Sequence, residues 1–328
     1  MKNRKLGFTD MQFTPIGLGT WAIGGGDNPF GWGPQDDRDS IATIQHALDK
    51  GINWVDTAAG YGNGHSEEVV GEALLGRRQE VFIATKCGVL WQEDGSNIYF
   101  NLAADSIRKE VELSLKRLKT DYIDLYQIHW PTDNDADIEE GWGAIADLIK
   151  AGKVRYGGVS NFNVEQLKIA QKIHPVASLQ PPYSMLERDV EDEILSFCGQ
   201  NNIGVIAYSP MQAGMLTGKM TAARVAAFPD DDWRKGSPHF QEPGLSINLE
   251  LVEKLGAIAA KLNRPVSHLA IAWVLRRKEV TGAIVGGRTP TQIAETVKAG
   301  DLTLSAEDAA AIDNLLKERD VKLAAAQS

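Results

Sequence analysis

The sequence predicts an α/β fold, namely a (β/α)8 TIM barrel with an N-terminal β-hairpin that caps the bottom of the barrel. Eight short apolar runs, rich in β-branched residues, alternate with amphipathic helical patterns along the 328 residues. The runs are apolar throughout, as the strands of a parallel sheet covered on both faces must be. Eight strand-and-helix units in a chain of this length are typical of a closed barrel. We expect residues 1–328 to form one domain.

The expected strands and helices alternate in order. The predicted strands cover residues 14–19, 53–56, 81–86, 123–129, 154–160, 176–180, 204–209 and 281–286. The predicted helices cover residues 40–50, 66–75, 104–118, 138–151 and 190–200, with others that start at Asn163, beyond Asn248 and at Thr289. Asn163 is followed three residues later by Gln166, which is a capping-box spacing. Thr289 is followed by Pro290 and then by Gln292 at the third position, which is again typical of a helix start.

The N-terminal hairpin is predicted from two short runs, residues 3–7 and 11–15, on either side of the turn-forming residues 8–10. Three connections are long, at residues 21–36, 87–101 and 211–246. Loops of this length in a compact domain are usually functional. Because all three follow strands, we expect them at the carboxyl end of the barrel, where the active sites of such barrels lie.

The composition excludes several classes of partner. The chain has 34 Lys and Arg residues against 44 Asp and Glu residues, and its net charge of −10 argues against nucleic acid or an anionic membrane surface as partner. Two cysteines, Cys87 and Cys198, are too few for a disulfide framework. No stretch approaches the roughly 18 apolar residues of a membrane span, and the amino-terminal residues lack the apolar region of a signal peptide. These features favour a cytoplasmic protein.

Polar side chains end six of the predicted strands. They are Asp56, Lys86, His129, Ser160 with Asn161, Gln180, and Tyr208 with Ser209. A polar group at the end of an apolar strand costs free energy if it is buried without a partner, and six such ends meet at one mouth of a barrel. A carboxylate, an ammonium and an imidazole at neighbouring strands are the components of a proton-transfer site.

Other chemistries have weaker support in the sequence. The six histidines show no i, i+4 pair and there is no Cys-x-x-Cys, so we expect no metal site; a hydrolase metal bound by Asp56 and His129 would lack a second histidine nearby. The segment 214–220 looks like a phosphate loop but has the wrong spacing. Residues 17–22 satisfy the loose dinucleotide pattern without the helix that it must open, which argues against a Rossmann fold. Ser160 lacks the glycines of a nucleophile elbow.

Seven segments together carry a family resemblance. They are GTW at 19–21, DT at 56–57, YGNG at 61–64, SEEVVG at 66–71, DYIDLYQIH at 121–129, GKVR at 152–155 and GVSNF at 158–162. In this order, over residues 5–296, the chain resembles the aldo-keto reductase superfamily, in its bacterial NADP-dependent type. The resemblance implies a barrel enzyme that transfers a hydride between NADP(H) and an aldehyde or ketone. The alternative is a cofactor-binding regulatory subunit of the potassium-channel β-subunit type, although we expect no added partner-docking segment.

The resemblance implies a catalytic tetrad of Asp56, Tyr61, Lys86 and His129. Carbonyl reduction needs a proton on the developing alkoxide, and a tyrosine with its ordinary pKa of about 10 is a poor acid at neutral pH. The Lys86 ammonium, held by Asp56, would lower the pKa of Tyr61. We therefore expect Tyr61 to be the general acid and His129 to hydrogen-bond the substrate oxygen.

The resemblance also implies a set of cofactor-binding residues. They are Thr20, Trp21, Asp56, Ser160, Asn161, Gln180, Tyr208, Ser209, Pro210, Met211, Gly214, Leu216, Lys219, Gly286, Gly287, Arg288, Thr289, Gln292 and Glu295. Within this set, Ser160, Asn161 and Gln180 would bind the carboxamide, and Tyr208 would stack on the nicotinamide ring. The segment 209–219 would wrap the pyrophosphate, and the segment 286–295 would hold the adenosine at the start of a helix.

The adenosine segment departs from much of the family. A glycine stands where lysine is common, Gln292 where arginine is common, and Thr296 where asparagine is common. Arg288 and Thr289 would still bind a 2′-phosphate, so we expect NADP(H) to be favoured over NAD(H), with NAD(H) left open.

The substrate is a small carbonyl compound that the sequence does not identify further. The residues expected to bind it are Trp21, Tyr61, Trp91, His129 and Trp130. Aromatic walls suit sugars, aryl aldehydes and steroids alike. Two further tryptophans in the mouth loops, Trp32 and Trp233, could instead anchor those loops.

Overall fold

The computed structural model describes residues 1–25, 31–95 and 97–327, and it confirms the predicted barrel. Eight parallel strands close in the order β10-β11-β12-β3-β4-β5-β8-β9. These strands are β3 (Ile16–Gly19), β4 (Trp54–Asp56), β5 (Phe82–Cys87), β8 (Ile123–Ile128), β9 (Val154–Ser160), β10 (Ser178–Gln180), β11 (Gly204–Ala207) and β12 (Val280–Gly286). Every strand lies within one residue of its predicted run or inside it, because most residues of each strand are buried, as in a parallel sheet covered on both faces.

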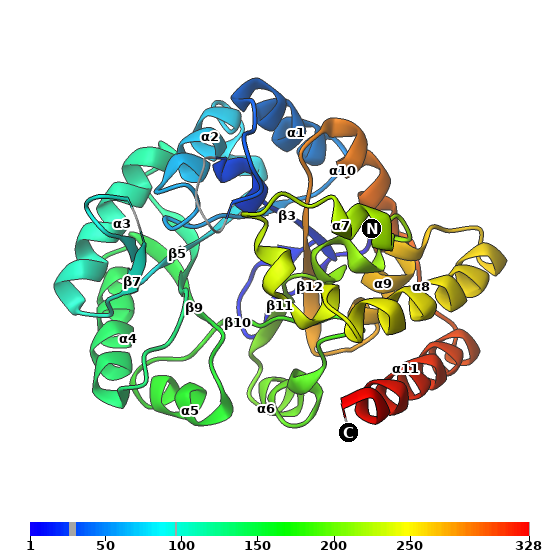
Figure 1. Ribbon diagram of the computed structural model, residues 1–328. Coiled ribbons are helices and arrows are strands. Elements are labelled where there is room, and N and C mark those ends of the chain that lie inside the picture. The colour runs from blue at the N-terminus through cyan, green and yellow to red at the C-terminus, as the bar shows by residue number, and fades with distance from the viewer. Residues whose placement is uncertain (26–30, 96, 328) are drawn as a thin grey trace.

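The helices form a ring around the strands (Figure 1). They are α1 (Asp37–Asp49), α2 (His65–Ala73), α3 (Ala104–Leu118), α4 (Asp135–Lys150), α5 (Val164–Ile173), α6 (Ile194–Gln200), α7 (Ala222–Ala226), α8 (Gly244–Lys261), α9 (Val266–Leu275), α10 (Pro290–Thr296) and α11 (Ala306–Gln327). Short 3-10 turns lie at η1 (Trp21–Gly24), η2 (Arg78–Glu80), η3 (Asp189–Glu191), η4 (Gln212–Thr217), η5 (Trp233–Gly236), η6 (Pro238–Phe240) and η7 (Val297–Asp301). The capping box of Asn163 and Gln166 is present, and Thr289 accepts a hydrogen bond from the Gln292 backbone. Both predicted helix starts are therefore confirmed.

The predicted N-terminal hairpin is present and closes the bottom of the barrel. Strands β1 (Arg4–Lys5) and β2 (Gln12–Phe13) pair antiparallel. The Phe13 ring stacks on Trp54 inside the barrel, with ring centroids 4.8 Å apart, and both side chains are fully buried. Gly17 is required beside this ring, since a Cβ there would lie 2.1 Å from Trp54. The open end of the barrel is therefore the carboxyl end of the strands.

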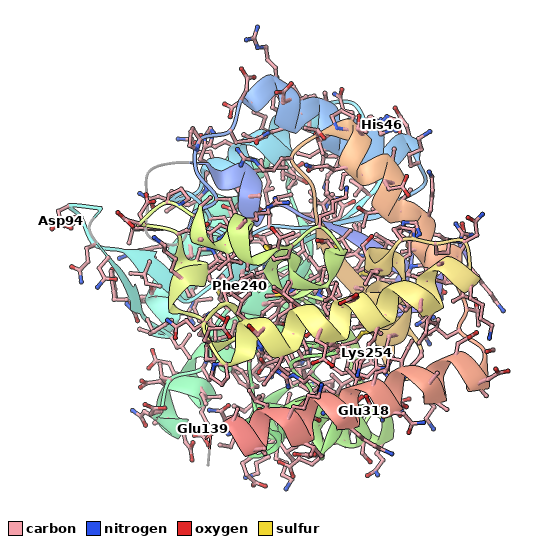
Figure 2. The ribbon with its side chains drawn as sticks, turned by 45° about the vertical axis from the view of Figure 1, so that its right-hand side comes forward. His46, Asp94, Glu139, Phe240, Lys254 and Glu318 are labelled. Carbon is pink, nitrogen blue, oxygen red and sulfur yellow. The ribbon has the colours of Figure 1, made fainter. Side chains whose placement is uncertain are left out.

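The three long connections gather at this open end and contain more structure than predicted. The loop 87–101 folds back as a second antiparallel hairpin, β6 (Val89–Trp91) with β7 (Ile98–Phe100), and Figure 2 shows it projecting with Asp94 near its tip. The loop 211–246 includes four helical turns, and α8 begins at Gly244, before the expected position. In the loop 21–36, residues 26–30 lie outside the described residues.

The C-terminal helix α11 runs beside α8 on the outside of the barrel, as Figures 1 and 2 both show. Arg319 of α11 donates to the Asn248 side chain of α8 at 3.0 Å, and Lys254 of α8 pairs with Glu318. Across the described residues, no helix has the length and apolar character needed to cross a membrane.

Candidate active site

Lys86 is the centre of a buried polar cluster at the open end of the barrel. Its Nζ donates to Asp56 Oδ2 at 2.7 Å, to the Thr57 carbonyl at 2.9 Å and to the Tyr61 hydroxyl at 3.1 Å. The Lys86 side chain is 0% exposed and that of Asp56 is 2% exposed. An ammonium has three N–H donors, so each has a partner and the buried charge is compensated by the carboxylate.

The strand register brings Asp56 and Lys86 together. Asp56 pairs with Ala84 of β5, and Lys86 lies two residues further along the same strand. Because side chains of a strand alternate between faces, Ala84 and Lys86 both point into the barrel, as Asp56 does. The side chains of Asp56 and Lys86, which lie 30 residues apart on neighbouring strands, therefore meet at the open end of the barrel.

Tyr61 is held in place by a tight glycine turn. Gly62 adopts a φ of +60°, and a Cβ there would lie 2.2 Å from the Gly24 carbonyl. The turn after β4 therefore packs directly on η1, which only glycine allows at this position. The Trp91 indole donates to the Gly60 carbonyl at 3.0 Å and holds the other side of the turn.

His129 completes the predicted tetrad. Its backbone N–H donates to the Cys87 carbonyl at 3.0 Å, and its ring meets the Tyr61 ring edge to face at a centroid distance of 5.7 Å. Burial, together with the Lys86 ammonium, lowers the pKa of His129 well below its usual value. The imidazole is therefore neutral at physiological pH, and it can donate a hydrogen bond without transferring a proton.

Lys86 lowers the pKa of Tyr61 as expected, but other groups outweigh this effect. Burial, helped by the negative charge of Asp56, raises the pKa of Tyr61 by more than the charge and hydrogen bond of Lys86 lower it, so the net direction is upward. Burial also lowers the pKa of Lys86, but Asp56 and Tyr61 outweigh it and leave that pKa raised. The resting site thus holds a protonated phenol against a charged ammonium.

The residues expected at the carboxamide form one hydrogen-bonded network beside the tetrad. Gln180 Nε2 donates to Asp56 Oδ1 at 2.7 Å, and Ser160 Oγ donates to the Gln180 carbonyl at 2.7 Å. Asn161 Nδ2 donates to Ser160 Oγ at 3.1 Å, and the Tyr208 hydroxyl donates to Asn161 Oδ1 at 2.9 Å. A planar carboxamide needs such amide and hydroxyl partners next to an aromatic ring, so the donor set fits a nicotinamide.

The expected pyrophosphate segment begins where β11 ends. It contains Ser209, Pro210, Met211, Gly214, Leu216 and Lys219. Four residues between positions 209 and 214 have left-handed φ values, namely Ser209, Gln212, Ala213 and Gly214. Successive backbone N–H groups in such turns form concave anion sites, which suits a phosphate. Leu216 is fully buried, and it anchors the segment to the core.

The expected adenosine segment is tied to a second loop. Arg288 donates through Nε to Gln35 Oε1 at 2.7 Å and through Nη1 to the Trp32 carbonyl at 3.0 Å, and its Nη2 bonds to the Pro34 carbonyl. Gln292 Oε1 accepts from the Arg288 backbone at 2.8 Å. No local pattern points to Gln35 as the partner, because it lies 253 positions away.

The remaining predicted cofactor residues lie around these groups. Thr20 is buried, and its hydroxyl donates to the Asp56 carbonyl at 3.1 Å. A Cβ at Gly286 would have open space around it, whereas at Gly287 it would lie 2.3 Å from Ile293. Glu295 pairs with Lys298 at the surface. Of these residues, Thr20 contacts the predicted tetrad directly, through its hydrogen bond to the Asp56 carbonyl.

The tryptophans form a wall beside Tyr61. Trp21 lies 6.5 Å from the Tyr61 ring, and it contacts Trp32 and Trp233 at centroid distances of 5.6 and 5.4 Å. Trp32 and Trp233 therefore join the wall and also link two loops. Trp130, next to His129, is 42% exposed.

Sequence reasoning missed two residues of the cluster. Thr57 supplies a carbonyl to Lys86, and Gln127 of β8 lies with its amide 3.5 Å from Asp56 Oδ1. Gln127 is fully buried inside an otherwise apolar strand run. A lone buried amide in such a run is the signal that could have found it.

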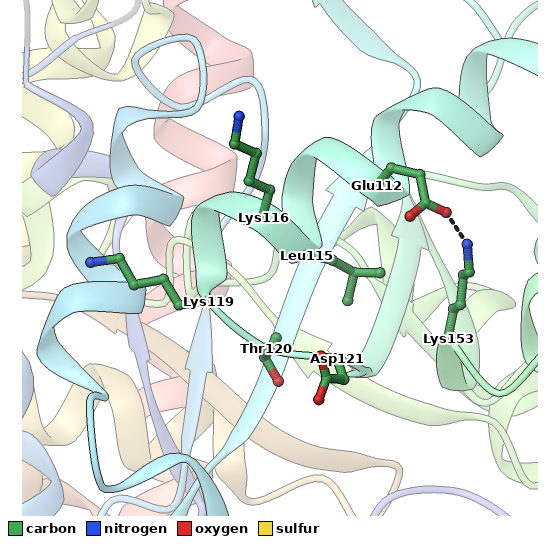
Figure 3. Close-up of a pocket in the computed structure, with 7 residues that line it drawn as sticks. All are labelled: Glu112, Leu115, Lys116, Lys119, Thr120, Asp121 and Lys153. Carbon is green, nitrogen blue, oxygen red and sulfur yellow. Dashed lines mark hydrogen bonds and ion pairs between the residues drawn. The ribbon is translucent and has the colours of Figure 1, made fainter.

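A hollow of about 480 Å³ lies at the other end of the barrel (Figure 3). It is lined by Glu112, Leu115, Lys116, Lys119, Thr120, Asp121 and Lys153. Thr120 and Lys153 precede β8 and β9, so the hollow is at the amino ends of these strands. Lys153 pairs with Glu112, and Lys119 pairs with Glu72. This hollow is separate from the tetrad.

Comparison with known proteins identifies the family. The model of the aldo/keto reductase family matches residues 15–317. Over 320 residues the chain is 40% identical to aldo-keto reductase YhdN of Bacillus subtilis, with 97% of this chain and 94% of that protein covered. It is 36% identical over 320 residues to the NADH-specific methylglyoxal reductase of Escherichia coli, with 94% and 96% covered. The solved glycerol dehydrogenase of Gluconobacter oxydans has a TM-score of 0.89 at 38% identity, with 97% and 96% covered.

These findings agree with the geometry of the site. The relatives are named as enzymes over nearly the full length of this chain, so the regulatory-subunit alternative is not favoured. The family uses nicotinamide cofactors, which the network from Asp56 to Tyr208 fits. The chain belongs to the aldo/keto reductase family, and it is an oxidoreductase that interconverts an aldehyde or ketone and its alcohol by hydride transfer.

Proposed function

We propose that Tyr61 is the proton donor of this reaction and that Lys86, Asp56 and His129 support it. The observation that carries this proposal is the 3.1 Å hydrogen bond from Lys86 Nζ to the Tyr61 hydroxyl, inside a buried ion pair. The resting phenol holds its proton, as a donor must. When that proton leaves, the phenolate lies against an ammonium in a site of low dielectric, where the stabilisation is strong.

The other residues of the site would bind the cofactor and orient the substrate. The nicotinamide cofactor supplies the hydride when it is bound. Ser160, Asn161 and Gln180 would hold its carboxamide, with Tyr208 against the ring. Neutral His129 would donate a hydrogen bond to the substrate oxygen and direct it toward Tyr61.

A small aldehyde or ketone is the substrate class that the wall supports best. Trp21 lies beside the Tyr61 ring, Trp91 bonds to the turn that carries Tyr61, and Trp130 follows His129. Aromatic surface near the site would orient compact molecules through its area and ring faces. One relative is named for methylglyoxal and one for glycerol, both of which are three-carbon compounds. The test is NADPH and NADH consumption with methylglyoxal, glyceraldehyde and a nitrobenzaldehyde. Turnover by the wild type and its loss in Tyr61→Phe are expected, whereas a flat trace with every substrate would contradict the proposal.

We also infer that the chain acts as one catalytic domain in the cytoplasm. Its two cysteines, Cys87 and Cys198, are both buried free thiols, which supports a reducing compartment. The barrel strands come from the whole length between Ile16 and Gly286, which supports a single catalytic unit.

NADP(H) is the cofactor that we propose as preferred, with Arg288 as the residue that recognises the 2′-phosphate. A guanidinium has five N–H groups, and those to Gln35, Trp32 and Pro34 use three of them. Among the contacts with described residues, two N–H groups of Arg288 have no partner and are left for a phosphate. The Escherichia coli relative is named as NADH-specific, so the preference has to be tested on this chain.

Arg288→Ala should weaken NADPH binding by about ten- to hundred-fold relative to NADH, because hydrogen bonds to charged groups contribute roughly 1.5–3 kcal/mol. Fluorescence titration with both cofactors measures the ratio. Arg108→Ala is the control, since Arg108 pairs with Asp105 and Asp147 on the outer helices. Equal losses for NADPH and NADH in Arg288→Ala would show that Arg288 only holds the loop.

The segment 211–246 should become more protected when cofactor binds. Trp233 of this segment contacts Trp21, and the Arg234 guanidinium lies 4.9 Å above the Trp32 ring, so the segment already touches the loop after β3. A cofactor between the two would add contacts that slow local opening. Hydrogen exchange of peptides from 211–246 should slow at saturating NADPH, while peptides of α3 stay unchanged. Unchanged exchange in 211–246 would contradict a closing role.

A further inference from the structure

Glu110 of α3 is a buried carboxylate that has no part in the proposed proton transfer. It is 4% exposed, and its Oε2 accepts the Gly88 backbone N–H at 2.9 Å. Its Oε1 accepts from Ser106 Oγ at 3.1 Å. Gly88 immediately follows β5, the strand that carries Lys86. The carboxylate of α3 therefore binds the backbone at the end of this strand from outside the barrel.

The bonded peptide group also holds His129. The N–H of Gly88 and the carbonyl of Cys87 belong to the same peptide unit. That carbonyl accepts the His129 backbone N–H at 3.0 Å. Glu110 is therefore connected to His129 through two hydrogen bonds and one peptide, with Lys86 one residue before that peptide. Hydrogen bonds in such a chain polarise one another, so a charged acceptor strengthens both.

The chain at Gly88 depends on this anchor. Gly88 has a φ of +85°, and a Cβ there would lie 2.6 Å from Leu102. Its N–H is buried, and without the carboxylate it would lack an acceptor, which is costly. The carboxylate thus fixes the point where β5 leaves the barrel and turns into the hairpin β6–β7.

We propose that Glu110 is a positioning residue for the active site, which acts as a carboxylate through the Cys87–Gly88 peptide on Lys86 and His129. The proposal rests on the catalytic roles proposed above for these two residues. Ionised Glu110 holds the peptide firmly and the enzyme turns over fastest. Protonated Glu110 is a weaker acceptor, and turnover falls.

The burial of Glu110 places this change near neutral pH. Burial raises the pKa of Glu110 from 4.5 to about 7. The groups that face it are Glu67 of α2, Arg117 of α3, Cys87 of β5 and Tyr126 of β8. Arg117 is already paired with buried Glu67 at 2.6 Å, so its charge is largely compensated. Within the described part of the chain, Glu110 forms no ion pair of its own.

Stability and catalysis should respond to Glu110 in opposite directions. A carboxyl whose pKa is raised by folding favours the folded state most when it is protonated, and this contribution is lost as pH rises through about 7. Glu110→Gln keeps an acceptor for Gly88 and has no charge. At pH 8 it should raise Tm, yet lower kcat roughly three- to ten-fold, because a neutral acceptor bonds about half as strongly as a charged one.

The kinetic experiment compares wild type, Glu110→Gln and Glu112→Gln between pH 5.5 and 8.5, with deuterated cofactor to confirm that hydride transfer limits turnover. Glu112 lies on the same helix and pairs with Lys153 at the surface, so it is the matched control. In the wild type and Glu112→Gln, kcat should fall as the pH drops below about 7. In Glu110→Gln, kcat should not show this fall. A Glu110→Gln profile that superimposes on the wild type, or a kcat loss accompanied by a lower Tm, would overturn the proposal.

An NMR experiment separates this proposal from the catalytic assignment. In 15N-labelled wild type, the amide protons of Gly88 and His129 should titrate together near pH 7, and both should be flat in Glu110→Gln. Amides that do not titrate in the wild type would overturn the coupling, whatever the kinetics show. If Tyr61→Phe kept full turnover, the catalytic assignment would fail while the amide titration still stood.

Discussion

Tyr61→Phe should lose turnover by about 10²- to 10⁴-fold, the range typical of positioned proton transfer, with little change in the NADPH dissociation constant. The ring stays in its contacts with Trp21 and His129, and only the hydroxyl bonded to Lys86 Nζ is removed. Single-turnover absorbance and fluorescence titration measure the two quantities. Tyr122→Phe is the matched control. Tyr122 lies just before β8, at the far end of the barrel, and its hydroxyl bonds to Gln79.

Tyr61 and Lys86 should also behave as one unit. If each acts only through the other, the double variant Tyr61→Phe with Lys86→Met loses scarcely more activity than either single variant. Tyr61→Phe that kept more than about a tenth of wild-type turnover, with an isotope effect showing hydride transfer to be rate-limiting, would contradict its role as proton donor. The isotope effect is needed since slow cofactor release can conceal a damaged chemical step.

The barrel could be predicted because its signals are local. Strand β9 and helix α3 were predicted with the bounds that the structure has, since each is a continuous run of apolar or amphipathic residues. The hairpin β6–β7 was not predicted, because its three-residue strands are half-exposed and carry no periodic pattern. Long-range pairing of polar side chains has no local signal either. The bonds from Arg288 to the loop at residues 32–35 are the clearest example.

The sequence predicted that Asp56, Lys86 and His129 would lie together, but the protonation of the predicted tetrad could not be predicted. The polar residues at the ends of β4, β5 and β8 indicated that Asp56, Lys86 and His129 would meet. The register of these parallel strands places the three side chains at the same end of the barrel. The pKa of Tyr61 depends on the balance between its burial and its distance from Lys86. That balance is set by the glycine turn at Gly62 and by η1, which are tertiary features.

Lys86→Met should strongly lower turnover and also destabilise the protein, because the ion pair with Asp56 serves both catalysis and the fold. With the ammonium gone, the phenolate of Tyr61 loses its stabilising charge, and turnover should fall by at least about 10²-fold. Asp56 would then be a buried carboxylate with the Gln180 amide at 2.7 Å as its main partner. Leaving one charge of a buried pair uncompensated costs about 3–5 kcal/mol of unfolding free energy. Urea denaturation measures this loss.

Adding Asp56→Asn to Lys86→Met should restore most of the lost stability and none of the activity. The neutral amide at position 56 can still accept from Gln180 through its oxygen, and no unpaired charge remains in the barrel. Activity should stay lost, because the phenol still has no ammonium beside it. Recovery of turnover in the double variant would show that Lys86 serves the fold and that Tyr61 works without it. If instead Lys86→Met were as stable as the wild type, water or a shift of Asp56 would be compensating the carboxylate, and the pair would contribute to catalysis alone.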